Sequence, residues 1–239
     1  LHSLRRRQRQ MCIRDRLKIM VPFQLTGTYK VKSVVPEGDY TIEDTVVVLS
    51  DKGGEDIKVN MIQKWPVKKA MTNYVEKPRP YKLLETGVRV IDTMNPIVEG
   101  GTGFIPGPFG TGKTVLQHAI SKQAEADIVI IAACGERANE VVEIFTEFPE
   151  LVDPHTGRKL MERTIIVANT SNMPVAAREA SVYTAMTMAE FYRAMGLKVL
   201  LMADSTSRWA QALREMSNRI EELPGPDLSL IHISEPTRR

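Results

Sequence analysis

Cysteine and long apolar segments are scarce in this sequence. The chain of 239 residues contains two cysteines, Cys12 and Cys134. Its longest apolar runs, such as residues 128–134 and 199–203, are far shorter than the roughly 20 residues that an apolar helix needs to cross a bilayer. These runs therefore do not predict a membrane-spanning helix.

The two ends of the chain look foreign to the rest. Residues 11–15 can be encoded by ATG TGT ATA AGA GAC, and the reverse complement of that string, read one base on, encodes residues 229–232. Extended in both directions, the reading resembles translated transposase-type sequencing adapter. We therefore expect residues 1–16 and 228–239 to be adapter sequence and exclude them from the fold prediction. The alternative is a genuine basic arm for nucleic acid or an anionic surface.

The basic character of the chain comes from these ends. The chain has 32 basic and 29 acidic residues, and its two ends contain eight of the basic and two of the acidic ones. Residues 17–227 therefore contain 24 basic and 27 acidic residues and carry a net charge of −3. This balance leaves no basic footprint for DNA or RNA, and we expect no nucleic-acid partner. Cys134 is the one cysteine in this span, which excludes an internal disulfide there and fits a reducing compartment.

A glycine-rich segment carries the strongest functional signal. It fits G-x-x-x-x-G-K-[ST], the phosphate-binding loop of P-loop NTPases. The predicted nucleotide-binding residues are Gly107, Pro108, Phe109, Gly110, Thr111, Gly112, Lys113 and Thr114. The glycines let backbone N–H groups approach a polyphosphate, Lys113 would reach the β- and γ-phosphates, and Thr114 would place a hydroxyl on Mg²⁺. The alternative is a glycine-rich turn between a strand and a helix.

The pattern of the chain changes at about residue 84. Residues 17–83 alternate apolar and polar residues between turn signals, which predicts a small antiparallel β module followed by a stiff linker. Residues 84–227 alternate apolar runs with amphipathic segments, which predicts part of a P-loop, RecA-like α/β domain with a mainly parallel sheet and helices on both faces. The expected strands are residues 29–35, 45–49, 57–67, 103–106, 127–133, 163–168 and 198–203, and the expected helices are residues 113–125, 138–148, 174–195 and 206–222.

Polar residues follow two of the expected parallel strands, at the edge where such sheets bind ligands. Glu136 and Arg137 come soon after residues 127–133. A carboxylate beside the phosphate loop suits a base that orients or deprotonates the water attacking the γ-phosphate. Glu136 could instead stabilise the N-terminus of the next helix through its dipole, and Arg137 could neutralise charge or bind a neighbour. Spacing alone leaves these readings open.

Asp204 and Arg208 follow the last expected strand. An aspartate after four apolar residues is typical of the second NTPase motif, whose carboxylate supports Mg²⁺, often through a water. Asp204 could instead cap the helix expected from residue 206. Arg208 could reach a γ-phosphate, pair with Glu136, or form only a surface salt bridge. No histidine or cysteine spacing predicts a metal other than Mg²⁺.

Together these motifs resemble the catalytic A subunit of V/A-type rotary ATPases. The matching segments are residues 86–92, 107–114, 135–137, 171–174, 203–210 and 213–215. Phe109 within the loop is typical of that subunit, whereas F-type β subunits and flagellar export ATPases usually carry a small residue there. The resemblance spans residues 17–227, and it implies that the β module is the end of that family's extra bulge insertion.

The resemblance implies roles and partners. Lys113 and Thr114 would bind phosphate and the Mg²⁺ of ATP or ADP, Glu136 would be the catalytic glutamate, Arg137 its charged neighbour, and Arg208 a residue near the γ-phosphate. The subunit would alternate with B subunits in a hexamer on a central stalk. ATP hydrolysis or synthesis would be coupled to H⁺ or Na⁺ movement through a membrane sector, with this subunit peripheral on the cytoplasmic face.

The resemblance also implies that other parts of the family's chain are missing. The adenine-pocket aromatics and the C-terminal helical domain lie outside this sequence, and the arginine finger should come from a B subunit. We therefore expect this piece alone to hydrolyse ATP at a negligible rate.

Two other classes of function are the alternatives. A Rho-like hexameric nucleic-acid translocase is disfavoured by the net charge of −3 in residues 17–227. A non-catalytic nucleotide-binding assembly subunit is disfavoured by the intact Lys113, Thr114 and Glu136.

Overall fold

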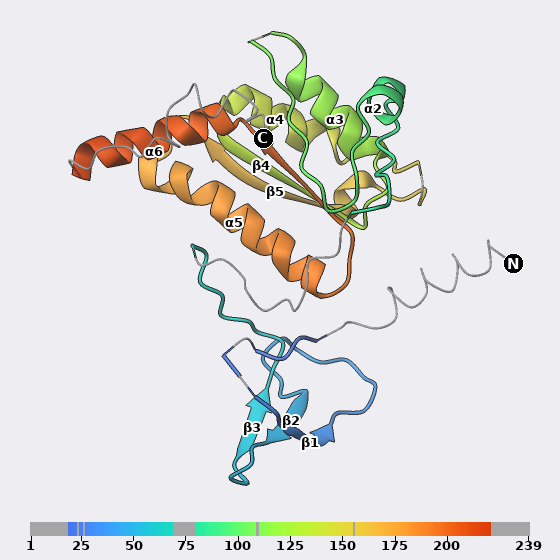
Figure 1. The fold of residues 1–239 in the computed structure, drawn as a ribbon, viewed down its shortest axis with the longest axis vertical. Coiled ribbons are helices and arrows are strands. Elements are labelled where there is room, and N and C mark those ends of the chain that lie inside the picture. The colour runs from blue at the N-terminus through green and yellow to red at the C-terminus, as the bar shows by residue number, and fades with distance from the viewer. Residues whose placement is uncertain are drawn as a thin grey trace, which may run out of the picture. The chain divides into compact units, whose positions relative to one another are not determined.

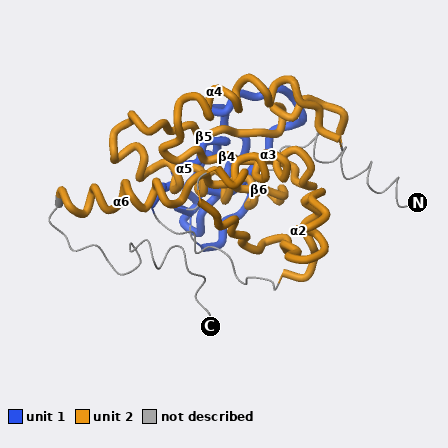
Figure 2. Tube along the Cα trace, turned by 90° about the horizontal axis from the view of Figure 1, so that it is seen from above, with its two compact units in different colours: residues 1–73 blue, residues 74–239 orange. Residues whose placement is uncertain are grey.

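The computed structural model describes residues 19–68 except 23 and 26, and residues 80–220 except 109 and 155. The predicted adapter segments, Phe109 and most of the predicted linker lie outside the described residues. The chain divides into two compact units, residues 1–73 and 74–239, and each is described by itself (Figure 2). This division falls just before the predicted linker.

The first unit contains a three-stranded antiparallel sheet. Its strands are β1 (Lys30–Val34), β2 (Val47–Ser50) and β3 (Asp56–Val59), in that order across the sheet. A tight turn joins β2 to β3, in which Gly54 has a φ of +81° and donates its N–H to the Asp51 carbonyl at 3.0 Å. The predicted antiparallel module is therefore confirmed.

The third strand of this unit is shorter than the sequence predicts. It ends at Val59 instead of continuing to residue 67. The Asn60 side chain accepts the Ile62 N–H at 3.2 Å, and such a local turn competes with strand pairing.

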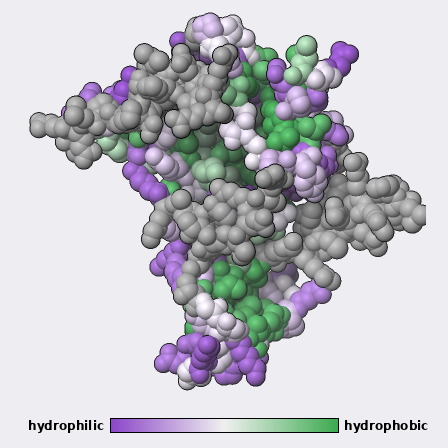
Figure 3. All heavy atoms as spheres, in the orientation of Figure 1, coloured by the Kyte–Doolittle hydropathy of each residue, from purple (hydrophilic) through white to green (hydrophobic). Residues whose placement is uncertain are grey.

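Several apolar side chains of this unit are exposed, among them Val31 and Ile42, and Figure 3 shows hydrophobic residues gathered on the visible face.

The second unit is built around a parallel sheet (Figure 1). The central strand β4 (Ile128–Glu136) lies between β5 (Thr164–Thr170) and β6 (Val199–Asp204), and both pairings are parallel. Helix α5 (Val175–Ala194) covers one face, and α3 (Lys113–Gln123) and α4 (Ala138–Glu147) lie on the other. The predicted mainly parallel sheet with helices on both faces is confirmed.

Three further elements complete this unit. Helix α6 (Thr206–Ile220) packs on α5, while α2 (Arg89–Met94) and the 3₁₀ helix η1 (Leu160–Arg163) are short elements that the sequence did not predict. None of the described helices combines the length and apolar character needed to cross a membrane.

The core explains why β4 reads as one apolar run. Val129 and Ile131 pack toward Ile144 of α4, whereas Ile130 and Ala132 pack toward α5. A strand that is covered on both faces buries consecutive side chains, so its sequence shows no polar alternation. Each fully buried Val or Ile contributes about 1.5–3 kcal/mol relative to exposure.

The strand predicted over residues 103–106 is wrong. These residues have no regular structure, and Phe104 is 58% exposed. Proline has no N–H to donate and glycine weakens a strand interior, so Gly103 and Pro106 both disfavour pairing. The chain reaches the phosphate-binding loop as an irregular segment.

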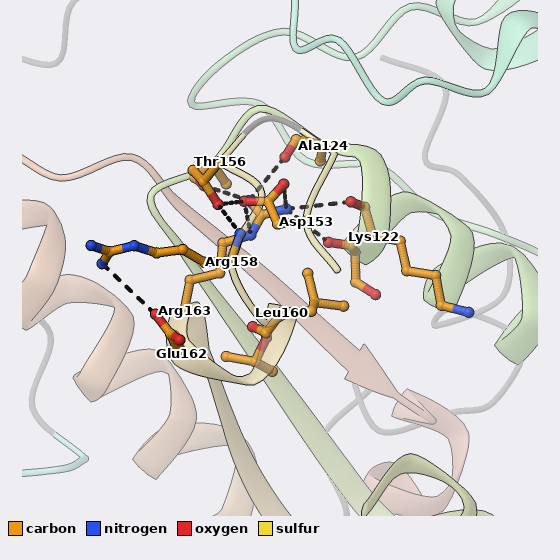
Figure 4. A network of polar contacts seen from close by, with 11 residues as sticks. Lys122, Ala124, Asp153, Thr156, Arg158, Leu160, Glu162 and Arg163 are labelled. Atoms are coloured by element: carbon orange, nitrogen blue, oxygen red, sulfur yellow. Dashed lines mark hydrogen bonds and ion pairs between the residues drawn. The ribbon is translucent and has the colours of Figure 1, made fainter. Parts of the chain in front are cut away.

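A buried arginine ties the end of α3 to the loop before β5 (Figure 4). Arg163 donates to the carbonyls of Ala124 at 3.1 Å and Ala126 at 2.6 Å, just beyond the C-terminus of α3. Its Nε lies 3.3 Å from Oδ2 of Asp153, whose side chain is 2% exposed. A cation at a helix C-terminus is favourable because the free carbonyls carry partial negative charge. The pair thus anchors the helix that follows the phosphate-binding loop.

Candidate functional site

Glycines shape the loop of residues 107–112. Gly110 and Gly112 each have a φ of +81°, a conformation that other residues adopt only with strain. A Cβ atom on Gly107 would lie 2.6 Å from the Thr111 hydroxyl oxygen, so a larger residue would collide there. That hydroxyl donates to the Pro108 carbonyl at 2.8 Å. The loop therefore closes on itself only with glycine at these positions.

The half-buried Lys113 is the first residue of α3 and folds back over this loop. Its Nζ donates to the carbonyl of Gly107 and to that of Pro108, the latter at 3.3 Å. The ammonium group thus lies above the loop backbone, where the motif predicts a polyphosphate.

Thr114 and Asp204 meet at the carboxyl end of β6, although they are 90 residues apart in the chain. The Thr114 hydroxyl donates to Oδ2 of Asp204 at 2.8 Å. Asp204 does not cap α6, because the carbonyl of Ser205 accepts the N–H of Arg208 at 3.2 Å and of Trp209 at 3.3 Å. Both side chains were predicted from the sequence to support Mg²⁺, and the fold brings them within hydrogen-bond distance of each other.

This pair of oxygens fits Mg²⁺. Magnesium is bound through oxygen, keeps several waters, and usually takes one or two protein ligands together with substrate phosphates. Among the described residues there is no group of three or more His, Cys, Asp or Glu side chains that could hold a metal. One hydroxyl and one carboxylate beside a phosphate loop match the small number of protein oxygens that Mg²⁺ usually takes.

Glu136 is buried at the end of β4 and paired with Arg208. Nη1 of Arg208 lies 2.5 Å from Oε2 of Glu136, whose side chain is 7% exposed, and also donates to the Gly135 carbonyl at 3.1 Å. Gly135 has a φ of +70°, and the pairing of β4 with β5 shifts register between Cys134 and Glu136, so a bulge lies at this glycine. Of the three alternatives for Arg208, the structure contains the ion pair with Glu136.

The first turn of α4 supplies a second carboxylate. Arg137 is exposed at the N-cap position of α4, where its carbonyl accepts the Glu140 N–H at 3.1 Å. Oε2 of Glu140 lies 3.9 Å from Nη1 of Arg208. The first-turn acid that faces the helix dipole is thus Glu140, whereas Glu136 lies before the helix. Glu140 was not predicted as a site residue from the sequence, although acids are favoured in the first turn of a helix.

The surroundings of Glu136 change its acidity. Burial raises the pKa of Glu136 to about 7, and a hydrogen bond with Glu140 and the charge of Asp204 act in the same direction, while Arg208 opposes them. The pKa of Glu140 is lowered, first because its carboxylate takes part in that hydrogen bond and also because Arg208 and Arg137 lie nearby. The two carboxyl groups therefore titrate as a pair. A carboxylate with a pKa near neutrality can accept a proton efficiently.

Known proteins are similar to this chain in sequence. Residues 87–227 match the ATP synthase alpha/beta family, nucleotide-binding domain, and residues 11–68 match the ATP synthase alpha/beta subunit barrel-sandwich domain. The V-type ATP synthase alpha chain of Treponema denticola is 65% identical over 210 residues, which cover 88% of this chain and 36% of that protein. The V-type ATP synthase alpha chain of Clostridioides difficile is 59% identical over 210 residues, which cover 88% of this chain and 35% of that protein. The chain thus spans about a third of the length of these curated relatives.

A solved structure shares the fold. It comes from a structural and biochemical analysis of a prototypical ATPase from the type III secretion system of pathogenic bacteria. It is 28% identical in sequence, superposes with a TM-score of 0.61, and matches 73% of this chain and 51% of that chain. The match to the nucleotide-binding domain covers residues 87–227, more than half of the chain, so the chain belongs to the ATP synthase alpha/beta family.

Proposed function

We propose that this chain is part of the catalytic alpha chain of a V-type rotary ATP synthase, which hydrolyses or synthesises ATP in step with H⁺ or Na⁺ movement across a membrane. One observation carries the proposal: the Thr114–Asp204 and Glu136–Arg208 pairs lie at the same edge of the sheet, beside the phosphate loop. Relatives that are 56–65% identical bear the name V-type ATP synthase alpha chain.

Each side chain of the site has a defined task in this proposal. Lys113 exchanges its loop carbonyls for the β- and γ-phosphates of the nucleotide. Thr114 and Asp204 would hold Mg²⁺, which when bound would neutralise negative charge on the phosphate oxygens. Glu136 orients the attacking water and accepts its proton, and Arg208 holds Glu136 and lies next to the developing charge.

The proposal includes the partners implied by the resemblance. B subunits alternate with this chain in a hexamer and supply the arginine finger, which is worth about 10³–10⁵ in rate. A central stalk connects the hexamer to the ion-translocating sector, and the subunit is peripheral on the cytoplasmic face of the membrane. The piece alone would then lack a group that the transition state needs.

ATP hydrolysis by the complete complex tests this function. We expect phosphate release that depends on Mg²⁺ in the complex containing the full-length alpha chain, and none in the same complex with Lys113→Ala. Because Lys113 contributes a charge-assisted contact to the phosphates, Lys113→Ala should weaken nucleotide binding about 10- to 100-fold. Titration with a fluorescent nucleotide measures this loss. Equal nucleotide affinity in the native and Lys113→Ala complexes would show that Lys113 does not bind the phosphates.

The acidity of Glu136 gives a second prediction. In Glu140→Gln, the acid limb of the plot of kcat/KM against pH should lie about one pH unit lower than in the native protein. In the native protein the hydrogen bond with Glu140 helps to keep the pKa of Glu136 near 7, so activity falls as the pH drops through that value and Glu136 becomes protonated. Without the Glu140 carboxylate, Glu136 stays ionised at lower pH.

The control for this prediction lies on the same helix. Glu143 is exposed on α4, and Glu143→Gln should leave the acid limb in place. A limb that stays fixed or moves upward in Glu140→Gln would contradict the coupling of the two carboxyl groups.

A further inference from the structure

The position of Arg208 depends on how α6 is attached to α5. Arg208 lies in the first turn of α6, and its guanidinium reaches both the Gly135 carbonyl and Glu136. The neighbouring Trp209 donates its Nε1–H to the Glu179 carbonyl at 2.9 Å, which holds this turn against α5. A small movement of α6 along α5 would therefore move the guanidinium relative to Glu136.

An ion pair farther along α6 fixes the same two helices. Nη2 of Arg178 on α5 donates to Oε2 of Glu215 on α6 at 2.9 Å. Glu215 follows Arg208 by seven residues, about two helical turns, so both project from a similar side of α6. Gln211 lies between them on the helix and donates to Oε1 of Glu215 at 3.1 Å, which orients the carboxylate toward Arg178.

Arg178 also lies against the residue that precedes Glu136. A Cβ atom on Gly135 would lie 3.5 Å from Cδ of Arg178 and 3.6 Å from Cβ of Arg208, so the two arginine side chains flank this glycine. The Arg178 side chain is 14% exposed, and its Nε is buried with no hydrogen-bond partner in the described part of the chain. The one ion pair of this cation in the described structure is with Glu215.

We propose that the Arg178–Glu215 pair is a positioning device that holds Arg208 against Glu136 and so controls the rate of ATP turnover. The inference rests on the proposed function. Removing the Glu215 charge leaves the buried Arg178 guanidinium without its counter-charge. Arg178 then shifts toward solvent, α6 loses its second attachment to α5, and Arg208 no longer lies tightly on Glu136.

Steady-state ATP hydrolysis by the complete complex with Glu215→Gln tests this role. We expect kcat to fall about tenfold, since small misplacements of a catalytic constellation are costly in rate. KM for Mg-ATP should change less than about twofold, because the phosphate loop is untouched. The acid limb of the pH profile should move to higher pH, since a carboxyl group that loses a nearby cation becomes less acidic.

Two matched variants separate positioning from general destabilisation. Glu190→Gln on α5 breaks the pair between Glu190 and Arg193, whose arginine is 52% exposed, and should leave kcat and the acid limb unchanged. In an Arg208→Lys background, Glu215→Gln should cost less than about twofold, because its effect passes through Arg208. If Glu215→Gln does not assemble, Arg178→Lys keeps the charge, loses the planar fork and should show the same changes in smaller degree.

The outcomes are distinct. The positioning role would be overturned if the acid limb of the pH profile stayed in place in Glu215→Gln. It would also be overturned if Glu215→Gln lowered kcat tenfold even in the Arg208→Lys background. A native complex without ATP hydrolysis would instead defeat the proposed function, and this inference with it.

Discussion

Glu136→Gln should abolish turnover in the complete complex while ATP still binds. Loss of a general base typically lowers the rate by about 10²–10⁴. The amide keeps the shape of the side chain and can still contact Arg208, but it cannot accept a proton from the attacking water. The contacts expected to bind the phosphates, from the loop, Lys113 and Thr114, remain. We therefore expect kcat to collapse and nucleotide affinity to stay within about threefold of native.

Single-turnover hydrolysis and a nucleotide titration measure the two effects separately. Glu143→Gln on the exposed side of α4 is the control for removing one acid from this region, and it should be near-native in both assays. Near-normal turnover in Glu136→Gln would show that Glu136 is a structural residue at the end of β4, and the catalytic assignment would fail.

Arg163→Met should destabilise the protein by about 3–5 kcal/mol, the usual cost of breaking a buried ion pair from one side. The substitution leaves the carboxylate of Asp153, which is 2% exposed, without its guanidinium. The carbonyls of Ala124 and Ala126 also lose their donor at the end of α3. In the complete protein, the thermal transition of the domain that contains α3 should have a midpoint lower by about 6–20 °C.

Arg158→Met is the matched control in the same loop (Figure 4). The Arg158 side chain is 51% exposed, and its Nη1 lies 3.7 Å from Oε2 of Glu162. Loss of this exposed ion pair should lower the free energy of unfolding by less than about 1 kcal/mol. Combining Arg163→Met with Asp153→Asn should cost less than the sum of the two single changes, because the second removes the stranded charge. Additive costs would mean that the two side chains do not act as a pair.

Local patterns predicted most of the secondary structure. The helices expected over residues 113–125, 138–148 and 174–195 end within two residues of the observed α3, α4 and α5. Strands β4, β5 and β6 contain the expected apolar runs, because a sheet covered on both faces requires continuous apolar sequence, but β4 continues three residues beyond the prediction, to Glu136. The same rule gave a wrong prediction at residues 103–106, where an apolar pair between Gly103 and Pro106 resembles a strand but pairs with no strand among the described residues.

The candidate site was predictable only in part. Five site residues were predicted because they lie in the phosphate-loop motif or close to the end of an expected strand: Lys113, Thr114, Glu136, Asp204 and Arg208. The sequence left open whether Asp204 supports Mg²⁺ or caps a helix, because both roles suit an aspartate at the end of a strand. In the structure the carboxylate of Asp204 accepts the Thr114 hydroxyl, since the parallel pairing of β4 with β6 carries Asp204 to the edge where α3 begins.

The sequence by itself determined the family of motifs, the alternation of strands and helices, and the residue types of the site, since these depend on neighbours a few positions apart. Tertiary structure alone decided which charges meet: Arg208 with Glu136, Glu140 beside both, and Arg178 with Glu215. The ion pairs of Arg208 with Glu136 and of Arg178 with Glu215 join residues that lie 72 and 37 positions apart in the chain. Their distances depend on how helices pack on the sheet, and no local pattern records that packing.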